Sequence, residues 1–276
     1  MTLSRQPTSR AKSGASGNGW ARQRLLNACI DDLTMDELMS RLDAGMLFTL
    51  NPNHLYHLQR DPDFCQAYLQ AEFVTCDSGY LFWALRLMGR GVRSRLSGSD
   101  IVPTFCDHHA NNPATRIFLL GARPGIAQRA MERINARVGR EICVGAHGPS
   151  MNFVNDEAEI QSVLAAIQAC QATVLIVGLG APKQEIWINR YRHRLPRVKV
   201  FMGVGATIDY EAGSVARAPL WMRRIGFEWL YRVVTEPRRY LRRYVRDAVF
   251  VWLVFLDAIG LYKRPSFPPP EGASKL

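Results

Sequence analysis

The sequence lacks closely spaced cysteines, clusters of cysteine with histidine, and long apolar runs. Its six cysteines are widely separated along 276 residues, and most lie within apolar stretches. A structural zinc site is therefore not expected, and we predict buried thiols in a reducing compartment. No segment reaches the roughly 18 consecutive apolar residues of a membrane-spanning helix. The N-terminus has no apolar stretch of the secretory kind, and residues 1–23 are predicted to be a disordered lead-in.

Lysine is also scarce in this basic chain. Five of the 35 basic residues are Lys and the rest are Arg, against 24 acidic residues, which gives a formal charge of +11. Arg binds phosphate and carboxylate groups through paired, planar hydrogen bonds. The charge favours nucleic acid, an anionic membrane surface or a phosphorylated substrate as the partner.

Six short apolar segments alternate with helix-like stretches between residues 24 and 205. They show little alternation of polar and apolar residues, which is typical of strands buried on both faces. A capping box at Thr34–Glu37 and the Asp61-Pro62 pair indicate helix starts. We predict an α/β fold with a Rossmann-like, mostly parallel sheet and helices on both faces. The predicted strands are Met46–Leu50, Glu72–Cys76, Arg116–Leu120, Ile142–Ala146, Thr173–Val177 and Val198–Met202.

The composition changes after Asp209. Residues 217–246 contain nine Arg and only two acidic residues, with six aromatic residues between them. Residues 248–256 form an unbroken apolar run, and the end of the chain is rich in Pro and Gly. We therefore predict a Rossmann-like domain over residues 24–210, a basic helical appendage over residues 211–262, and a disordered tail over residues 263–276.

Two glycine-containing segments follow predicted strands and precede helices. Gly178–Glu185 offers small residues for close approach of a ligand, and free N–H groups at a helix start favour phosphate. Lys183 and Gln184 fall in the first helical turn, where their side chains could reach a nucleotide. The segment lacks the full dinucleotide and P-loop patterns, so a tight strand–helix turn is the alternative. Gly121–Gly125 has the same form, with the same alternative.

Polar residues follow two other predicted strands. Asp77 comes directly after an apolar segment, where a carboxylate could act as a general base or could cap the next helix. Thr49 and Asn51 end another strand, and ordinary turn chemistry would also explain them. Asp61 and Asp63 resemble a metal-binding Asp-x-Asp pair, but their place between two helix-like segments favours capping.

The arginines of the appendage admit several interpretations. Arg232, Arg239 and Arg242 fall at spacings that share one face of a helix, although Pro237 could interrupt it. They could clamp a phosphate or contact anionic lipid, with Trp and Tyr at the membrane interface. They could also bind nucleic acid, or form a solvated helix face. The neighbouring apolar run favours a membrane surface.

Together these residues resemble the WecG/TagA/CpsF family of bacterial glycosyltransferases, also called glycosyltransferase family 26. The similarity extends from about Thr34 to Arg246, and the order and spacing of its pieces make it specific. The matching pieces are Thr49–Pro52, Val74–Asp77, Trp83–Arg90, Ser97–Asp100, Leu119–Gly125, Gly178–Glu185, Gly203–Ala206, Ala212–Pro219, Glu228–Arg232 and Glu236–Arg239.

The resemblance implies transfer of a sugar from a UDP-sugar to a polyprenyl-diphosphate-linked saccharide, with inversion at the anomeric carbon and with no metal or other cofactor. It implies that Asp77 is the general base, that Thr49 lies beside it, and that Gln184 is a polar active-site residue. The arginines that match those placed near the diphosphate are Arg232, Arg239 and Arg242. The residues expected to bind the ligand are Asn51, Gly121, Gly178, Gly180, Pro182, Lys183, Gln184, Glu185 and Gly205.

The expected partners are the UDP-sugar, the lipid-linked saccharide and the inner face of the cytoplasmic membrane, with no nucleic acid. A homo-oligomer is left open. The product would belong to an exopolysaccharide or another cell-surface polysaccharide, and the sugar is of the glucose or N-acetylmannosamine type. Ser78 separates Asp77 from Gly79 where the family often has Asp-Gly, which could reshape the acceptor side. The alternatives are a nicotinamide-dependent oxidoreductase and a non-catalytic basic module that binds lipid or nucleic acid.

Overall fold

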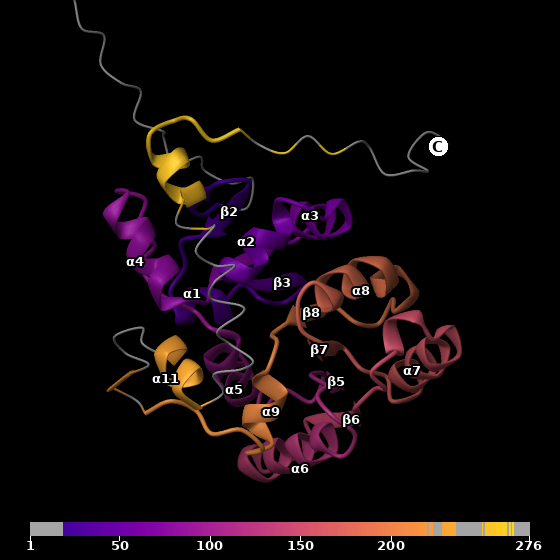
Figure 1. Ribbon diagram of the computed structural model, residues 1–276. Coiled ribbons are helices and arrows are strands. Elements are labelled where there is room, and N and C mark those ends of the chain that lie inside the picture. The colour runs from indigo at the N-terminus through magenta and orange to yellow at the C-terminus, as the bar shows by residue number, and fades with distance from the viewer. Residues whose placement is uncertain are drawn as a thin grey trace, which may run out of the picture.

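A computed structural model describes residues 19–219, 221–222, 228–235, 250, 252–263, 265 and 267. Its centre is a six-stranded parallel sheet with the strand order β4-β3-β8-β7-β5-β6 (Figure 1). The strands are β3 (Gly45–Leu50), β4 (Phe73–Cys76), β5 (Ile117–Gly121), β6 (Cys143–His147), β7 (Val174–Gly178) and β8 (Val200–Gly203). Each predicted strand overlaps one of them, and the predicted α/β fold is confirmed. Residues 1–18 of the predicted lead-in lie outside the described residues, as does most of the predicted tail, whereas residues 22–23 of the lead-in form the start of a strand.

Helices cover both faces of the sheet, and each face has its own apolar core. One core joins the strands to α2 (Pro52–Leu58), α3 (Pro62–Leu69), α4 (Gly79–Leu87), α7 (Glu157–Ala169) and α8 (Lys183–Tyr191). The other joins them to α1 (Met35–Met39), α5 (Gly98–His108), α6 (Ile126–Val138) and α9 (Thr207–Glu211). Short 3₁₀ turns occupy η1 (Phe153–Asn155) and η2 (Arg192–Arg194), and α11 spans Glu228–Thr235.

Local sequence explains where several helices begin. Thr34 forms the predicted capping box with Glu37 at the start of α1. Asp61 accepts a hydrogen bond from the Phe64 N–H at 3.0 Å and so caps α3, with Pro62 at the first helical position. Both helix starts were predicted, because a side-chain oxygen at this position replaces a missing backbone acceptor.

A short antiparallel hairpin was not predicted. Strands β1 (Arg22–Leu25) and β2 (Ala28–Asp31) are joined through Leu26, which has a positive φ of 54°. The turn has no glycine, so the usual hairpin pattern is missing. Asp31 fastens the hairpin to the sheet by accepting a hydrogen bond from the Val74 N–H at 2.6 Å.

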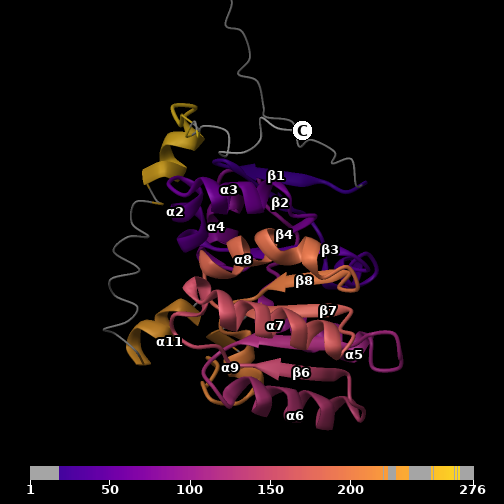
Figure 2. The same ribbon diagram turned by 90° about the vertical axis from the view of Figure 1, so that its right-hand side faces the viewer.

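The carboxyl ends of the strands meet at one edge of the sheet. Figure 2 shows the strand arrows pointing toward the side on which α9 and α11 lie. In open parallel sheets, ligands bind beyond this edge. The segments around Thr49, Asp77, Gly121, Gly178 and Gly205 each follow or end one of these strands, whereas Asp61 and Asp63 lie at the start of α3.

Candidate active site

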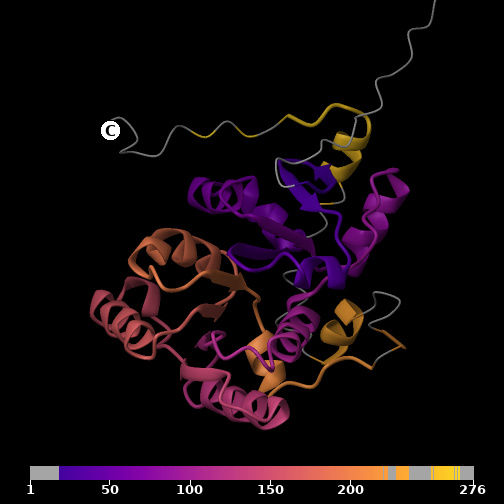
Figure 3. The same ribbon diagram turned by 180° about the vertical axis from the view of Figure 1, so that it is seen from behind.

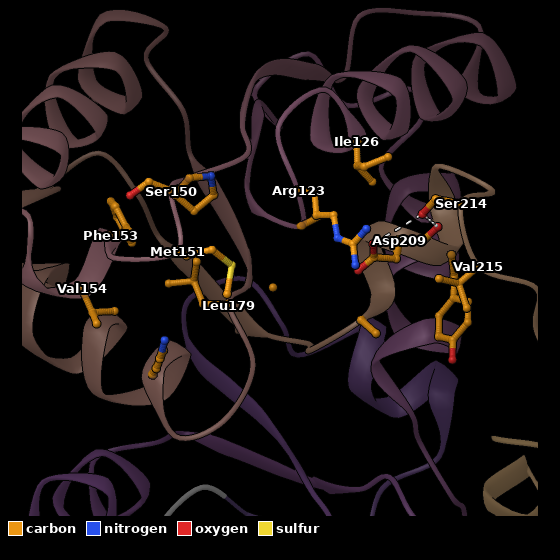
Figure 4. A pocket seen from close by; sticks show the side chains of 16 residues that line it. Arg123, Ile126, Ser150, Met151, Phe153, Val154, Leu179, Asp209, Ser214 and Val215 are labelled. Carbon is orange, nitrogen blue, oxygen red and sulfur yellow. Dashed lines mark hydrogen bonds between the residues drawn. The ribbon is translucent and has the colours of Figure 1, made fainter. Parts of the chain in front are cut away.

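Two adjoining hollows lie along the carboxyl edge. The smaller has a volume of about 220 Å³ and is lined by residues that follow β3, β4, β7 and β8. The larger has a volume of about 660 Å³ and is lined by residues that follow β5, β6 and β7, together with α9 and the residues after it. Ala206 and Tyr210 line both hollows. Figure 4 shows the larger one, with Arg123, Asp209 and Val215 on one side and Met151 and Val154 on the other.

Residues that follow β3 form one wall of the smaller hollow. The buried Thr49 hydroxyl donates to the Gly203 carbonyl on β8 at 3.4 Å, which fixes the side chain between the two strands. Asn51 caps α2 by accepting a hydrogen bond from the His54 N–H at 3.3 Å. The turn chemistry offered as the alternative for Asn51 is therefore present, yet both residues also line the hollow.

Asp77 lies on the same wall, directly after β4. Its N–H donates to the Leu50 carbonyl at 3.0 Å, and Arg95 donates to its carbonyl oxygen at 3.0 Å. The helix that follows is capped by Ser78, whose hydroxyl accepts from the Leu81 N–H at 3.4 Å. The capping role that was the alternative for Asp77 thus belongs to its neighbour. The Asp77 residue lines the smaller hollow, close in the fold to Thr49.

Gln184 ties together two glycine loops at the opposite wall. Its buried side-chain oxygen accepts hydrogen bonds from the N–H groups of Gly180 at 3.2 Å and Gly205 at 3.1 Å. Both glycines have positive φ values, 79° and 56°, which L side chains rarely adopt. The side-chain nitrogen of Gln184 donates to Glu185 at 2.8 Å. Gln184 therefore sets the positions of the loops after β7 and β8.

The remaining predicted ligand-binding residues do not line the smaller hollow and lie in four different places. Gly178 and Lys183 line the larger hollow. A Cβ atom at Gly121 would lie 2.6 Å from the backbone of Gly178, so this glycine permits the close approach of β5 and β7. Pro182 follows a cis peptide bond at the N-terminus of α8. Glu185 is fully buried.

Glu185 belongs to a buried polar cluster that includes His54, a residue that lines the smaller hollow. Its Oε1 lies 3.8 Å from Nδ1 of His54, which in turn lies 2.6 Å from the Tyr68 hydroxyl. Its Oε2 has no hydrogen-bond partner among the residues that the structure describes. Burial raises the pKa of Glu185 from 4.5 to about 7, because the interior disfavours the charged form. No pattern in the sequence indicates His54 beyond its place three residues after Asn51.

This pKa shift predicts how stability depends on pH. A raised pKa in the folded state means that the contribution of Glu185 to folding is fully present below pH 4.5 and is lost as the pH rises through about 7. In the parent protein this shift lowers the free energy of unfolding by about 3 kcal/mol as the pH rises across this interval. Glu185→Gln should not show this decrease. Urea unfolding below and above the interval measures it, with Glu132→Gln on the surface of α6 as the control. An unchanged pH dependence in Glu185→Gln would contradict the assignment.

An ionic network, not predicted from the sequence, holds the chain after α9 against the start of α5. Arg217 contacts Asp100 at 2.9 Å and donates to the Ser99 carbonyl at 3.0 Å. The Ser97 hydroxyl donates to the same carboxylate at 2.6 Å, while Arg95 lies 3.9 Å from it. Although burial acts to raise the pKa of Asp100, these contacts lower it overall. Ser97 and Ser99 line the smaller hollow, so the network shapes its wall.

Of the three predicted appendage arginines, the structure describes only the backbone of Arg232. Arg232 lies on α11, and its side chain is outside the described residues, as are Arg239 and Arg242. Glu228, the first residue of α11, lines the smaller hollow. This helix therefore reaches the same hollow as Asp77. Within the described part of the chain, no group of three or more His, Cys, Asp or Glu residues has a metal-binding arrangement.

These features define a Rossmann-like α/β protein with a hollow lined by polar residues at the carboxyl edge of its sheet. Residues 23–264 match the Glycosyl transferase WecG/TagA/CpsF family. The chain belongs to this glycosyltransferase family, which the sequence resemblance predicted. Membership favours a sugar-transferring enzyme over an oxidoreductase or a non-catalytic module.

Two curated relatives give more detail. The N-acetylglucosaminyldiphosphoundecaprenol N-acetyl-beta-D-mannosaminyltransferase of Bacillus spizizenii is 30% identical over 200 residues, which cover 72% of this chain and 74% of the relative. The protein of the same name from Bacillus subtilis is 29% identical over 246 residues, which cover 89% of this chain and 91% of the relative. The similarity thus extends over nearly the whole length of the second relative.

Proposed function

We propose that the protein transfers a hexose or N-acetylhexosamine from a UDP-sugar to a polyprenyl-diphosphate-linked saccharide. The observation that carries the proposal is the smaller hollow, where Asp77 and Thr49 face the glycine loops held by Gln184. The names of both relatives favour N-acetylmannosamine as the sugar and N-acetylglucosaminyl-diphosphoundecaprenol as the acceptor. The product would enter an exopolysaccharide or another cell-surface polysaccharide.

In the proposed reaction, Asp77 acts on the acceptor and the appendage arginines act on the leaving diphosphate. The Asp77 carboxylate takes the proton of the acceptor hydroxyl while its oxygen attacks the anomeric carbon of the sugar. The bond from that carbon to the phosphate oxygen breaks with inversion, and UDP leaves. Arg232, Arg239 and Arg242 would stabilise the negative charge that develops on the diphosphate, because charge-assisted hydrogen bonds are strong.

The two hollows would hold different parts of the substrates. The larger has a volume in the range of small-molecule sites and includes Lys183 at the N-terminus of α8, a place suited to phosphate. We assign it to the UDP portion of the donor. The smaller hollow adjoins it through Ala206 and Tyr210 and would hold the sugar and the acceptor hydroxyl.

A lipid-linked acceptor places the reaction at a membrane surface. No helix within the described residues is both long and apolar enough to cross a bilayer. We propose peripheral association with the inner face of the cytoplasmic membrane, where UDP-sugars are available. The basic appendage would take part in that association.

The proposal is tested by measuring UDP release from full-length protein in detergent. A panel of UDP-sugars is combined with polyprenyl-diphosphate-linked saccharides, and N-acetylmannosamine with the N-acetylglucosaminyl lipid is the first pair. Acceptor-dependent UDP release with transfer of the sugar to the lipid is expected. Tight UDP binding without transfer to any acceptor in the panel would contradict the proposal.

Turnover is expected to survive removal of divalent metal. The arginines would supply the positive charge that a metal supplies elsewhere, and Asp61 of the Asp-x-Asp pair is already engaged in capping α3. Initial rates with and without a chelator, before and after Mg²⁺ or Mn²⁺ is restored, measure the effect. If the rate falls to background with chelator and returns with metal, a metal ion, and not the arginines, stabilises the charge on the leaving diphosphate.

A further inference from the structure

Exposed apolar side chains are concentrated in two parts of the described chain. Twelve large apolar residues are strongly exposed, and nine of them lie on α4 or beyond residue 220. Single exposed apolar residues are ordinary, whereas a gathered set indicates an interaction surface. The nine are Trp83, Leu87, Trp221, Leu230, Val234, Trp252, Phe255, Ile259 and Leu261.

The outward face of α4 is unusual for a helix that covers a core. Leu81 and Leu85 point inward and are fully buried. On the outer side, Trp83 is 51% exposed and Leu87 is 89% exposed, at a spacing of four residues that places them on one face. A surface helix normally carries polar residues there. Both side chains are thus largely exposed and lie outside the two apolar cores of the domain.

A basic residue accompanies these apolar side chains. The guanidinium carbon of Arg86 lies 5.9 Å from the ring centre of Trp83 and 5.7 Å from that of Phe82. Tryptophan beside arginine and leucine is the composition of helices that lie in a membrane interface. The positive charge complements anionic lipid headgroups.

The α4 face continues into the C-terminal helical residues 252–258. Figures 1 and 3 show this segment, drawn in yellow, beside α4. Asp257 forms an ion pair with Arg90 just after α4, and the rings of Tyr80 and Phe250 lie 6.4 Å apart. Trp252 and Phe255 are exposed, with their rings 5.7 Å apart. The ion pair and the Tyr80–Phe250 contact therefore hold the C-terminal segment, with its exposed apolar residues, against α4.

This surface also starts at the proposed site of reaction. Helix α4 begins at Gly79, two residues after Asp77. At a rise of about 1.5 Å per residue, Leu87 lies about 12 Å along the helix from that start. A bilayer that contacted Leu87 would therefore lie against the helix that directly follows Asp77 in the chain.

We infer that Trp83, Arg86 and Leu87 of α4 form a lipid-contacting face of the Rossmann-like domain, continuous with the exposed side of residues 252–261. The choice of a bilayer as occupant rests on the proposed function, because the acceptor is lipid-linked. The face would seat the domain so that the acceptor diphosphate reaches the hollow without leaving the membrane surface.

The test measures binding of full-length protein to vesicles of phosphatidylethanolamine and phosphatidylglycerol in flotation experiments without substrates. Leu87→Ser should lower the partition coefficient roughly ten-fold, the cost of exposing one leucine side chain to water, and Trp83→Ser/Leu87→Ser should lower it further. Leu69→Ser is the matched control, because Leu69 is 71% exposed on α3. It should bind like the parent protein, and Arg86→Ala should bind less tightly only when phosphatidylglycerol is present.

Several outcomes would overturn the inference. The first is that Trp83→Ser/Leu87→Ser binds vesicles as well as Leu69→Ser does, while the two variants have the same melting temperature. Another is a change of molar mass in light scattering without a change in vesicle binding, which would assign the face to a second copy of the chain. Turnover on a short-chain, water-soluble acceptor should stay unchanged in these variants. The vesicle assay contains no substrate, so its result does not depend on whether the protein transfers a sugar in the UDP-release assay.

Discussion

Asp77→Asn is expected to lower kcat by about 10²–10⁴-fold, the usual contribution of a general base. Asparagine has nearly the shape of aspartate, and the backbone bonds that hold this position, to Leu50 and from Arg95, do not involve the side chain. The smaller hollow should therefore keep its form. UDP release with the lipid-linked acceptor under single-turnover conditions measures the chemical step.

The pattern of the kinetic change separates catalysis from binding. A loss of kcat with little change in KM indicates a group that acts in the transition state, whereas a raised KM alone indicates lost binding. Asp63→Asn is the control, because the Asp63 carboxylate is exposed on α3 and lies 3.8 Å from Arg190. Full turnover by Asp77→Asn would exclude this carboxylate as the base.

The fold was largely predictable because its strands are short, apolar and separated by clear helix starts. Each of the six predicted segments became a strand of the central sheet. The hairpin at residues 22–31 was missed because its turn, at Leu26, carries neither Gly nor Asn-Gly. It is stabilised by a contact with Val74, and a partner that lies 43 residues away leaves no local pattern.

The site was predictable only as a set of strand ends. Six of the predicted residues gather around the smaller hollow: Thr49, Asn51, Asp77, Gly180, Gln184 and Gly205. What each side chain contacts depended on residues distant in the sequence. Glu185 faces His54 inside the domain, and Arg217 reaches Asp100 across the start of α5. Such pairs are brought together by the sheet, and no spacing along the chain indicates them.

Gln184 illustrates how the structure changes the expected effect of a substitution. The resemblance indicates a polar residue of the active site, but its amide is occupied by two backbone N–H groups and by Glu185. Its contribution is then to position the loops that carry Gly180 and Gly205. Loss of the side chain should disturb stability and turnover together.

Gln184→Met is expected to lower the free energy of unfolding by roughly 2–4 kcal/mol, because two N–H groups lose their acceptor and a buried carboxyl loses a donor. Displacement of the loops by about 1 Å should also lower kcat/KM by about 10²-fold. Urea unfolding and initial rates measure the two effects on the same preparation.

A second glutamine provides the matched control for Gln184→Met. Gln168 is exposed on α7, lines neither hollow, and donates one hydrogen bond to the Arg194 carbonyl at 2.8 Å. Gln168→Met should cost about 1 kcal/mol or less and leave kcat/KM unchanged. If Gln184→Met instead lost turnover while its unfolding matched that of Gln168→Met, the side chain would act on the substrate directly. Equal behaviour of both variants in both measurements would remove Gln184 from the site altogether.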